Sequence, residues 1–130
     1  MRLLSRHCLR PVLAMLAAGF LSGTVMAQSS GAPARGAQLY QSRCGACHSV
    51  NAHRVGPKHA GVFNRRAGTQ SGFRYTPALA ESGLIWDRDT LDLWLEDPTG
   101  LVPGTSMGFR VRDAQDRADI IAFLETLLAE

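Results

Sequence analysis

The sequence predicts one small all-α domain that cannot fill its core with side chains alone. The clearest helix lies near the C-terminus, where apolar residues recur at helical spacing: Ile120, Phe123, Leu124, Leu127 and Leu128. No segment alternates as a strand does, and residues 48–75 and 100–111 lack periodicity and read as loops. A chain of 130 residues, 45% of them hydrophobic, folds as one domain. With so few helices, another component should complete its core.

Three further helices are predicted from capping residues and apolar faces. Residues 35–43 form a short helix in which Gly36 permits the close approach of another backbone. Polar caps mark the starts of the later helices, at Thr76, Asp87 and Asp113. The helix after Asp87 is expected to stop at Pro98, and it has one apolar face made of Leu91, Trp94 and Leu95.

Residues 1–27 are typical of a secretory signal peptide. Three arginines precede the apolar run from Val12 to Leu21, and small residues end at Ala27, which suits cleavage there. The uncharged stretch is shorter than the roughly 20 residues of a membrane-spanning helix, so we predict export with cleavage. A retained signal would instead anchor the protein in the membrane. Residues 28–34 then form a flexible lead-in, and residues 35–130 form the functional domain.

Cleavage changes the charge and the set of reactive side chains. The full chain has 14 Lys and Arg against 11 Asp and Glu, but residues 1–27 hold three of the arginines and no acid. The mature chain is therefore formally neutral, and a nucleic-acid partner loses its support. Two cysteines remain, Cys44 and Cys47, together with one methionine, Met107.

The two cysteines lie in the pentapeptide Cys44-Gly45-Ala46-Cys47-His48, which is the pattern of covalent haem attachment. Each thiol can bond one vinyl group of a haem, and His48 then places a ring nitrogen on the iron. The haem would also supply the missing apolar core. A structural disulfide stays open as an alternative. A thioredoxin-like dithiol lacks its βαβ context, and a zinc site lacks further ligands.

Met107 is the candidate for the second axial ligand of the iron. It follows Pro103 and Gly104 in a loop, whereas a methionine that only fills a core usually lies on a helix face. A thioether held by a turn suits low-spin haem iron. Histidine–methionine ligation raises the reduction potential and leaves no open position for a substrate, so no catalytic residue is expected.

Beyond this pentapeptide, several motifs occur in the order in which class I cytochromes c carry them. After CGACH come Gly56-Pro57, GVFNRRAG at 61–68, GFRYT at 72–76, Trp86 and VPGTSM at 102–107. Over residues 36–127 the chain resembles this family in its soluble bacterial and mitochondrial form. The resemblance implies the cytochrome c fold, in which small helices wrap around one covalently bound haem c.

The resemblance also implies roles for residues around the haem. The carbonyl of Pro57 would accept the ring N–H of His48 and so fix the tautomer of this iron ligand. Four further side chains would bind the haem propionates or offset their charge: Arg65, Tyr75, Trp86 and Thr105. The first helix would cross the last one, and Phe109 would lie near the exposed haem edge.

Other positions depart from the family or lie outside its haem contacts. Trp94 stands in the haem pocket where the family has a tyrosine that hydrogen-bonds the methionine sulfur. Leu79 replaces an asparagine that supports an internal water, and both changes make the methionine side drier. His53 matches a histidine that ties loops together, whereas His59 is predicted to lie at the surface.

The ring of lysines around the haem edge is nearly absent, since Lys58 is the only lysine of the chain. Four arginines can replace it as a smaller basic patch, unless they are ordinary solvated charges: Arg43, Arg54, Arg110 and Arg112.

The sequence therefore predicts a periplasmic electron carrier and not an enzyme. It would pass single electrons through haem iron, as a monomer with no nucleic-acid partner. Candidate partners are a quinol–cytochrome c reductase, a terminal oxidase, a reaction centre or a periplasmic dehydrogenase. Two alternatives stay open: a peroxidase-like or gas-binding haem protein in which Met107 is displaceable, and a dedicated haem subunit of a larger oxidoreductase.

Overall fold

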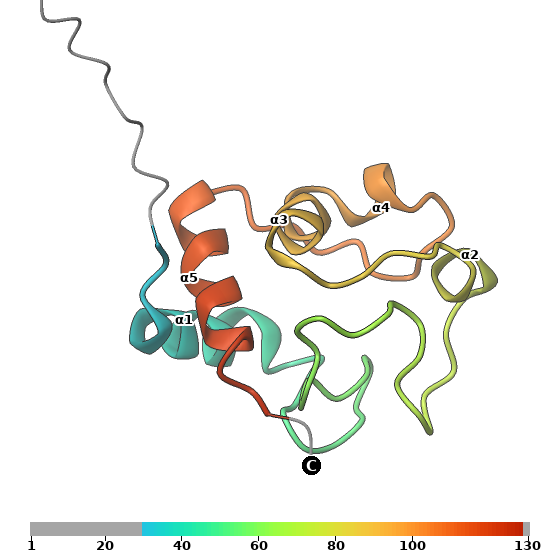
Figure 1. The fold of residues 1–130 in the computed structure, drawn as a ribbon, viewed down its shortest axis with the longest axis horizontal. Coiled ribbons are helices and arrows are strands. Elements are labelled where there is room, and N and C mark those ends of the chain that lie inside the picture. Colours follow the sequence, from blue (N-terminus) through green and yellow to red (C-terminus); the bar gives the residue numbers. More distant parts are fainter. Residues whose placement is uncertain (1–29, 129–130) are drawn as a thin grey trace, which may run out of the picture.

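The computed structural model describes residues 30–128 (Figure 1). Their helical elements in chain order are α1 (Pro33–Leu39), η1 (Tyr40–Cys44), α2 (Pro77–Ala80), α3 (Arg88–Glu96), α4 (Pro98–Leu101) and α5 (Ala114–Leu124). Among these residues the only β-type pairing is an isolated antiparallel bridge between Arg66 and Ile85, so the all-α prediction is confirmed. The predicted signal peptide, residues 1–27, lies outside the described residues, as do 28–29 and 129–130. No helix within the described range has the length and hydropathy needed to cross a bilayer.

The first helix is longer than predicted and changes its hydrogen-bond pattern part-way. α1 begins at Pro33 rather than at residue 35, because proline suits the first helical position. The chain continues directly into η1, where Gly45 N donates to Tyr40 O at 2.9 Å, closing a turn of the π type. Since η1 ends at Cys44, the helix leads straight into the cysteine pair.

α1 and α5 cross at the left of Figure 1 and make the most extensive contact between helices in the described part of the chain. At the crossing Gly36 is buried, and a Cβ atom there would lie 1.9 Å from the carbonyl oxygen of Asp119. Tyr40, one turn later, packs against Phe123 with ring centroids 5.2 Å apart. Only glycine allows this approach, which places the start of the cysteine segment against the last helix.

Asp119 ties the beginning of α1 to α5. It is 1% exposed and accepts hydrogen bonds from Ala32 N at 2.7 Å and from Gln115 Nε2 at 2.8 Å. Arg35 covers the carboxylate with an ion pair but is itself half exposed, so the pair lies close to solvent. The bonds from Ala32 and Arg35 hold the pKa of Asp119 below its ordinary value. Residues 31–34, predicted as flexible lead-in, are therefore part of the folded domain.

The predicted caps begin the later helices. The side chains of Asp87 and Asp113 each accept a backbone N–H bond at 2.8 Å from the third residue along the chain. Thr76 accepts one in the same way at 3.4 Å. α3 buries the apolar face that the sequence predicted, made of Leu91, Trp94 and Leu95. This face turns toward α5, against which α3 also packs.

Two helix ends differ from the prediction. Pro98 was expected only to stop α3, but it begins α4 because the Asp97 side chain accepts a hydrogen bond from Gly100 N at 3.1 Å and caps a further turn. α5 ends at Leu124, whereas the apolar spacing predicted a helix that continues to Leu128. Leu128 is 82% exposed, so it is not buried although it continues the helical pattern of apolar residues.

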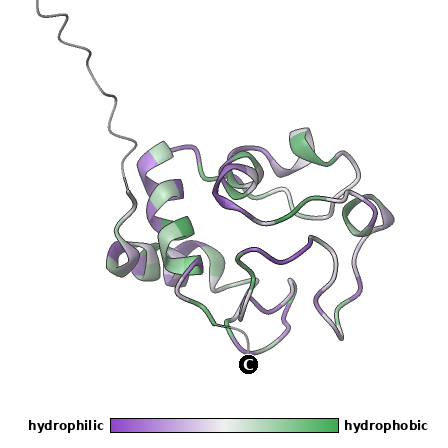
Figure 2. Ribbon diagram, viewed as in Figure 1, coloured by the Kyte–Doolittle hydropathy of each residue, from purple (hydrophilic) through white to green (hydrophobic). Residues whose placement is uncertain are grey.

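Residues 48–76 are held by hydrogen bonds between loops rather than by helices. His53 accepts a hydrogen bond from Lys58 N at 3.1 Å through Nδ1, so its Nε2 carries the proton and donates to Ser71 O at 2.9 Å. The loop-tying role predicted for His53 is thereby confirmed. In Figure 2 these loops are mostly hydrophilic or near neutral, whereas α5 carries both hydrophobic and hydrophilic turns.

Candidate functional site

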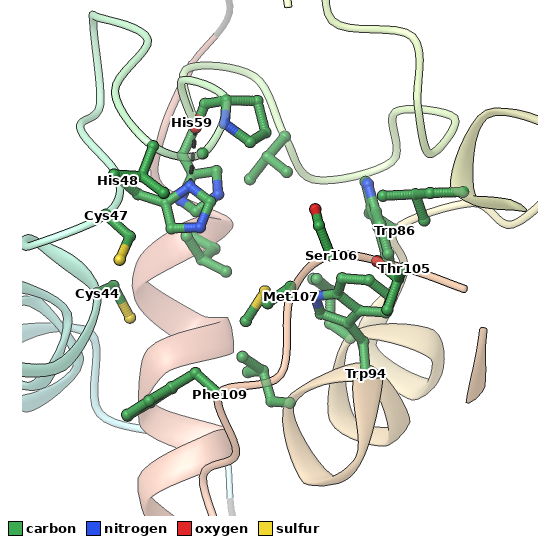
Figure 3. A pocket seen from close by; sticks show the side chains of 18 of the residues that line it. Cys44, Cys47, His48, His59, Trp86, Trp94, Thr105, Ser106, Met107 and Phe109 are labelled. Atoms are coloured by element: carbon green, nitrogen blue, oxygen red, sulfur yellow. Dashed lines mark hydrogen bonds between the residues drawn. The ribbon is translucent and has the colours of Figure 1, made fainter. Parts of the chain in front are cut away.

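The helices and loops enclose a cavity of about 370 Å³, a size within the range of ordinary ligand pockets. Apolar side chains of α3 and α5, among them Leu91 and Ile120, form part of its wall. All the residues that the sequence assigned to a cofactor also line this cavity: Cys44, Cys47, His48, Pro57, Arg65, Tyr75, Trp86, Trp94, Thr105 and Met107. Figure 3 shows most of these side chains converging on one space.

Cys44 and Cys47 present their sulfur atoms on one side of the cavity (Figure 3). Both are free thiols, so the structure does not support the disulfide alternative. Burial raises the pKa of the Cys44 thiol to about 11. His48 N donates to Cys44 O at 2.8 Å, and this turn brings the histidine to the cavity beside the thiols. No cluster of three or more side chains suited to a metal ion such as zinc occurs within residues 30–128.

His48 is held in the tautomer that a metal ligand needs. Its Nδ1 lies 2.9 Å from the carbonyl oxygen of Pro57. Because a carbonyl only accepts, Nδ1 carries the proton and Nε2 keeps its lone pair. Burial lowers the pKa of His48, and the bond to Pro57 opposes this shift only in part. Gly56 is required beside the ring, since a Cβ there would lie 2.2 Å from Cε1 of His48.

His59 was predicted to lie at the surface, but it packs against His48. The two imidazole rings stack with centroids 4.2 Å apart and planes 20° from parallel. Burial, His48 and Arg65 together lower the pKa of His59 to about 3, so its ring is neutral. Its buried Nδ1 has no hydrogen-bond partner among the described residues. The available signal was its position two residues after Pro57, whose carbonyl bonds His48.

Met107 enters the cavity opposite His48, from the loop that follows α4 (Figure 3). Trp94 also faces this space; it is 7% exposed and lies tilted against Trp86 with ring centroids 5.1 Å apart. Leu79 is a further part of the cavity wall. Trp94 and Leu79 therefore both add apolar surface to the cavity that Met107 enters.

Arg65 brings a positive charge to the cavity. Its guanidinium donates to Ala60 O at 2.8 Å and to Lys58 O at 3.5 Å, both neutral acceptors. Burial lowers the pKa of Arg65, while the nearby Tyr75 acts in the opposite direction. Trp86 N donates to Arg65 O at 3.0 Å, which fixes the loop that carries the arginine. A half-buried guanidinium held only by carbonyl oxygens is suited to an anionic group of a ligand.

The mouth of the cavity is apolar and less basic than predicted. Val55 is 78% exposed and Phe109 is 48% exposed, and both line the opening. Three of the four arginines assigned to a basic patch have other partners: Arg43 with Asp116 at 2.8 Å, Arg110 with Asp97 at 2.6 Å, and Arg54 with Gly45 O at 2.8 Å. Within residues 30–128 only the Arg112 guanidinium of this group is left without such a contact.

A family profile described as Cytochrome c matches residues 33–128, which is most of the chain. The chain belongs to the cytochrome c family. The family resemblance inferred from the motifs is thereby confirmed. Members of this family transfer electrons and are not enzymes, and this protein is a cytochrome c electron carrier with one covalent haem c.

Curated relatives and a solved structure agree with this assignment. Cytochrome c2 of Rhodomicrobium vannielii is 42% identical over 118 residues, which are 88% of this chain and 93% of the relative. Cytochrome c of Ulva intestinalis is 39% identical over 103 residues, 76% of this chain and 93% of the relative. The structure of cytochrome cH from Methylobacterium extorquens superposes with a TM-score of 0.71 at 40% identity, covering 74% of this chain and 99% of that one.

The residues of the cavity fit a c-type haem. Two free thiols stand beside a histidine whose Nε2 lone pair is available, and a thioether faces them from another loop. The wall is largely apolar, and Arg65 offers a charge for an anionic group. Each type of contact that such a cofactor needs is therefore present in this cavity.

Proposed function

We propose that this cytochrome is an exported, periplasmic carrier in which Cys44 and Cys47 hold the haem and His48 and Met107 ligate its iron. The observation that carries this proposal is the convergence of these four side chains on one cavity, with His48 fixed in the Nδ1-protonated tautomer. Haem iron supplies a one-electron couple between the ferrous and ferric states when bound.

The remaining pocket residues serve this couple by keeping the site closed and balanced in charge. Pro57 holds the His48 proton, which makes Nε2 a stronger donor to a metal. Arg65, Tyr75, Trp86 and Thr105, which line the cavity, would hold the haem propionates, and Trp94 would close the methionine side. Ligation by His48 and Met107 would leave no position on the iron for a substrate, which favours electron transfer over peroxidase-like chemistry.

The partners of the carrier are redox proteins, as expected for a relative of cytochromes c2. We infer that they meet it at the apolar mouth around Val55 and Phe109. Quinol–cytochrome c reductase, a terminal oxidase, a reaction centre and a periplasmic dehydrogenase are the candidates. Contacts of this kind are small and short-lived, which suits a shuttle that acts as a monomer.

Axial ligation is tested with Met107→Leu, which keeps the volume of the side chain and removes the sulfur. The wild-type ferric protein is expected to show the weak red absorption band that marks methionine–iron bonding and no spectral response to peroxide. Met107→Leu should lose the band and have a lower reduction potential, because methionine ligation raises it. Leu93→Ala, an exposed change on α3, is the control and should keep both.

A band that survives in Met107→Leu would contradict the assignment of Met107. A wild-type protein that binds cyanide or peroxide at once would favour the alternative of a haem enzyme or a gas-binding protein. Export is tested separately by mass spectrometry of the protein from the periplasmic fraction. Its mature chain should begin at Gln28, and Ala27→Asp should block this cleavage.

A further inference from the structure

His59 lines the cavity beside His48, but the proposed set of iron ligands does not include its imidazole. Its imidazole lies on the face of His48 at 4.2 Å between centroids and 20° between planes. At this distance and angle the two rings are in face-to-face contact. Any rotation of the His48 ring out of its plane therefore meets the ring of His59.

The other contacts of His48 do not by themselves fix the plane of its ring. The Pro57 carbonyl binds Nδ1 at 2.9 Å, which fixes one atom of the ring but permits rocking about the hydrogen bond. The Gly56 backbone lies against Cε1, where a Cβ atom would be at 2.2 Å. A flat neighbour on the ring face is the contact that restricts the remaining motion, and His59 supplies it.

His59 is itself held by ring contacts rather than by hydrogen bonds through Nδ1, which has no partner among residues 30–128. Tyr40 meets it edge-on, with centroids 5.6 Å apart and planes at 61°. Tyr40 in turn packs on Phe123 of α5 at 5.2 Å. A continuous row of rings therefore runs from the last helix to His48, and it links the ligand to the α1–α5 crossing.

We propose that His59 is a positioning residue that fixes the plane of the His48 ring, with Tyr40 as its support. This inference rests on the proposed function, in which His48 is an iron ligand. The plane of an axial imidazole decides which iron d orbital holds the unpaired electron of the ferric state. It thereby sets the pattern of the shifted haem methyl resonances in the proton NMR spectrum.

The test compares ferric holoproteins that carry His59→Phe and His59→Leu. Phenylalanine keeps a flat ring against His48, so the pattern of methyl resonances should stay close to that of the wild type. Leucine removes the flat face, so the order or the spread of these resonances should change, together with the reduction potential. Ile121→Val is the matched control, since Ile121 is buried in α5 outside the cavity lining. It should lower thermal stability without altering the resonance pattern.

Tyr40→Leu removes the support behind His59 without touching His48, and it should shift the same resonances in the same direction by less. If His59→Leu does not accumulate with haem, Tyr40→Leu decides the question alone. The proposal is overturned if the leucine variants keep the wild-type pattern, or if His59→Phe departs from it as far as His59→Leu does. A wild-type spectrum that lacks resonances of an axial histidine would instead contradict the assignment of His48, so the two failures are distinguishable.

Discussion

The corner where α1 crosses α5 and the loops around the cavity are stabilised in different ways. In the corner, backbone meets backbone at Gly36, and Asp119 closes the contact with ion-pair and backbone hydrogen bonds. The loops of residues 48–76 and 102–111 instead depend on scattered hydrogen bonds and face the cavity from several sides. The corner is packed by protein atoms alone, whereas the loops need the cofactor as their common core.

The difference shows that two parts of a small domain can be stabilised separately, one by helix packing and the other by a cofactor. A crossing of two short helices buries little surface, so it cannot hold the whole chain, but it fixes the cysteine segment in place. The loops can then be arranged by the requirements of the haem rather than by helix packing. Each of the following changes acts on one side of this division.

Removal of both thiols should have the largest effect. In Cys44→Ser combined with Cys47→Ser, haem is not attached and roughly 400 Å² of apolar contact is lost, which is on the order of 10 kcal/mol. This exceeds the margin of most small domains, so we expect loss of the cooperative thermal transition followed by circular dichroism. Ser42→Ala, on the exposed side of η1, is the control and should keep haem and fold. A double variant that melts like the wild type would show that the loops do not need the cofactor.

A methyl group at Gly36 should damage the corner and spare the loops. The new Cβ would lie 1.9 Å from the backbone of Asp119, which cannot move aside as a flexible side chain can. We expect Gly36→Ala to lower the free energy of unfolding by about 3 kcal/mol, measured by urea titration. Gln38→Ala, an exposed change on the same helix, adds no atom to the crossing and should be nearly neutral. Equal losses for the two variants would argue against a special role for the crossing.

Much of the fold could be predicted because the signals that start and stop helices act between residues close together in the sequence. Asp87 and Asp113 cap the helices that the sequence assigned to them, because a cap bonds a backbone group three residues away. α4 was missed because Pro98 is suited to both the end and the start of a helix, and only the Asp97 side chain decides between them. The π turn of η1 likewise leaves no pattern of apolar residues that a sequence reveals.

More of the site than of the fold could be predicted, because binding a cofactor requires particular types of side chain that the sequence shows directly. Every side chain assigned to the cofactor lines one cavity, although these residues are spread along the chain from 44 to 107. His59 was missed because its burial depends on ring contacts with His48 and Tyr40, which no local pattern of residues reveals. The basic patch was overestimated for a similar reason, since the carboxylates that engage Arg43 and Arg110 come from elsewhere in the sequence.

The acidic side of the corner should respond to pH in a defined direction. The pKa of Asp119 is lowered in the folded protein by the bonds from Ala32 and Arg35, so its contribution is present above the unfolded pKa and is lost as pH falls through the folded pKa. We expect Asp119→Asn to cost about 1.5 kcal/mol at pH 7. The difference from the wild type should shrink on acidification in urea unfolding. Asp89→Asn, an exposed carboxylate of α3, is the control; a pH-independent gap for Asp119→Asn would contradict this account.

The smallest expected effect is on the salt dependence of electron transfer at the apolar mouth of the cavity. Because Arg43 and Arg110 are already paired with carboxylates, electron transfer to a redox partner should depend only weakly on ionic strength. Val55→Lys places a new charge on the exposed rim and should steepen the dependence measured by stopped-flow kinetics. Val55→Thr is the uncharged control. A wild-type rate that already falls steeply with salt would show that the rim is strongly charged after all.

The π turn of η1 has a consequence for how this segment can change over evolutionary time. Each residue of an α-helix turns the chain by about 100°, so the deletion of one residue between Tyr40 and Cys44 would leave a continuous helix with the first thiol facing a different direction. The helix itself would lose nothing in hydrogen bonding. We therefore expect exposed positions such as Gln41 and Ser42 to accept substitution, whereas the number of residues between Tyr40 and Cys44 should be fixed.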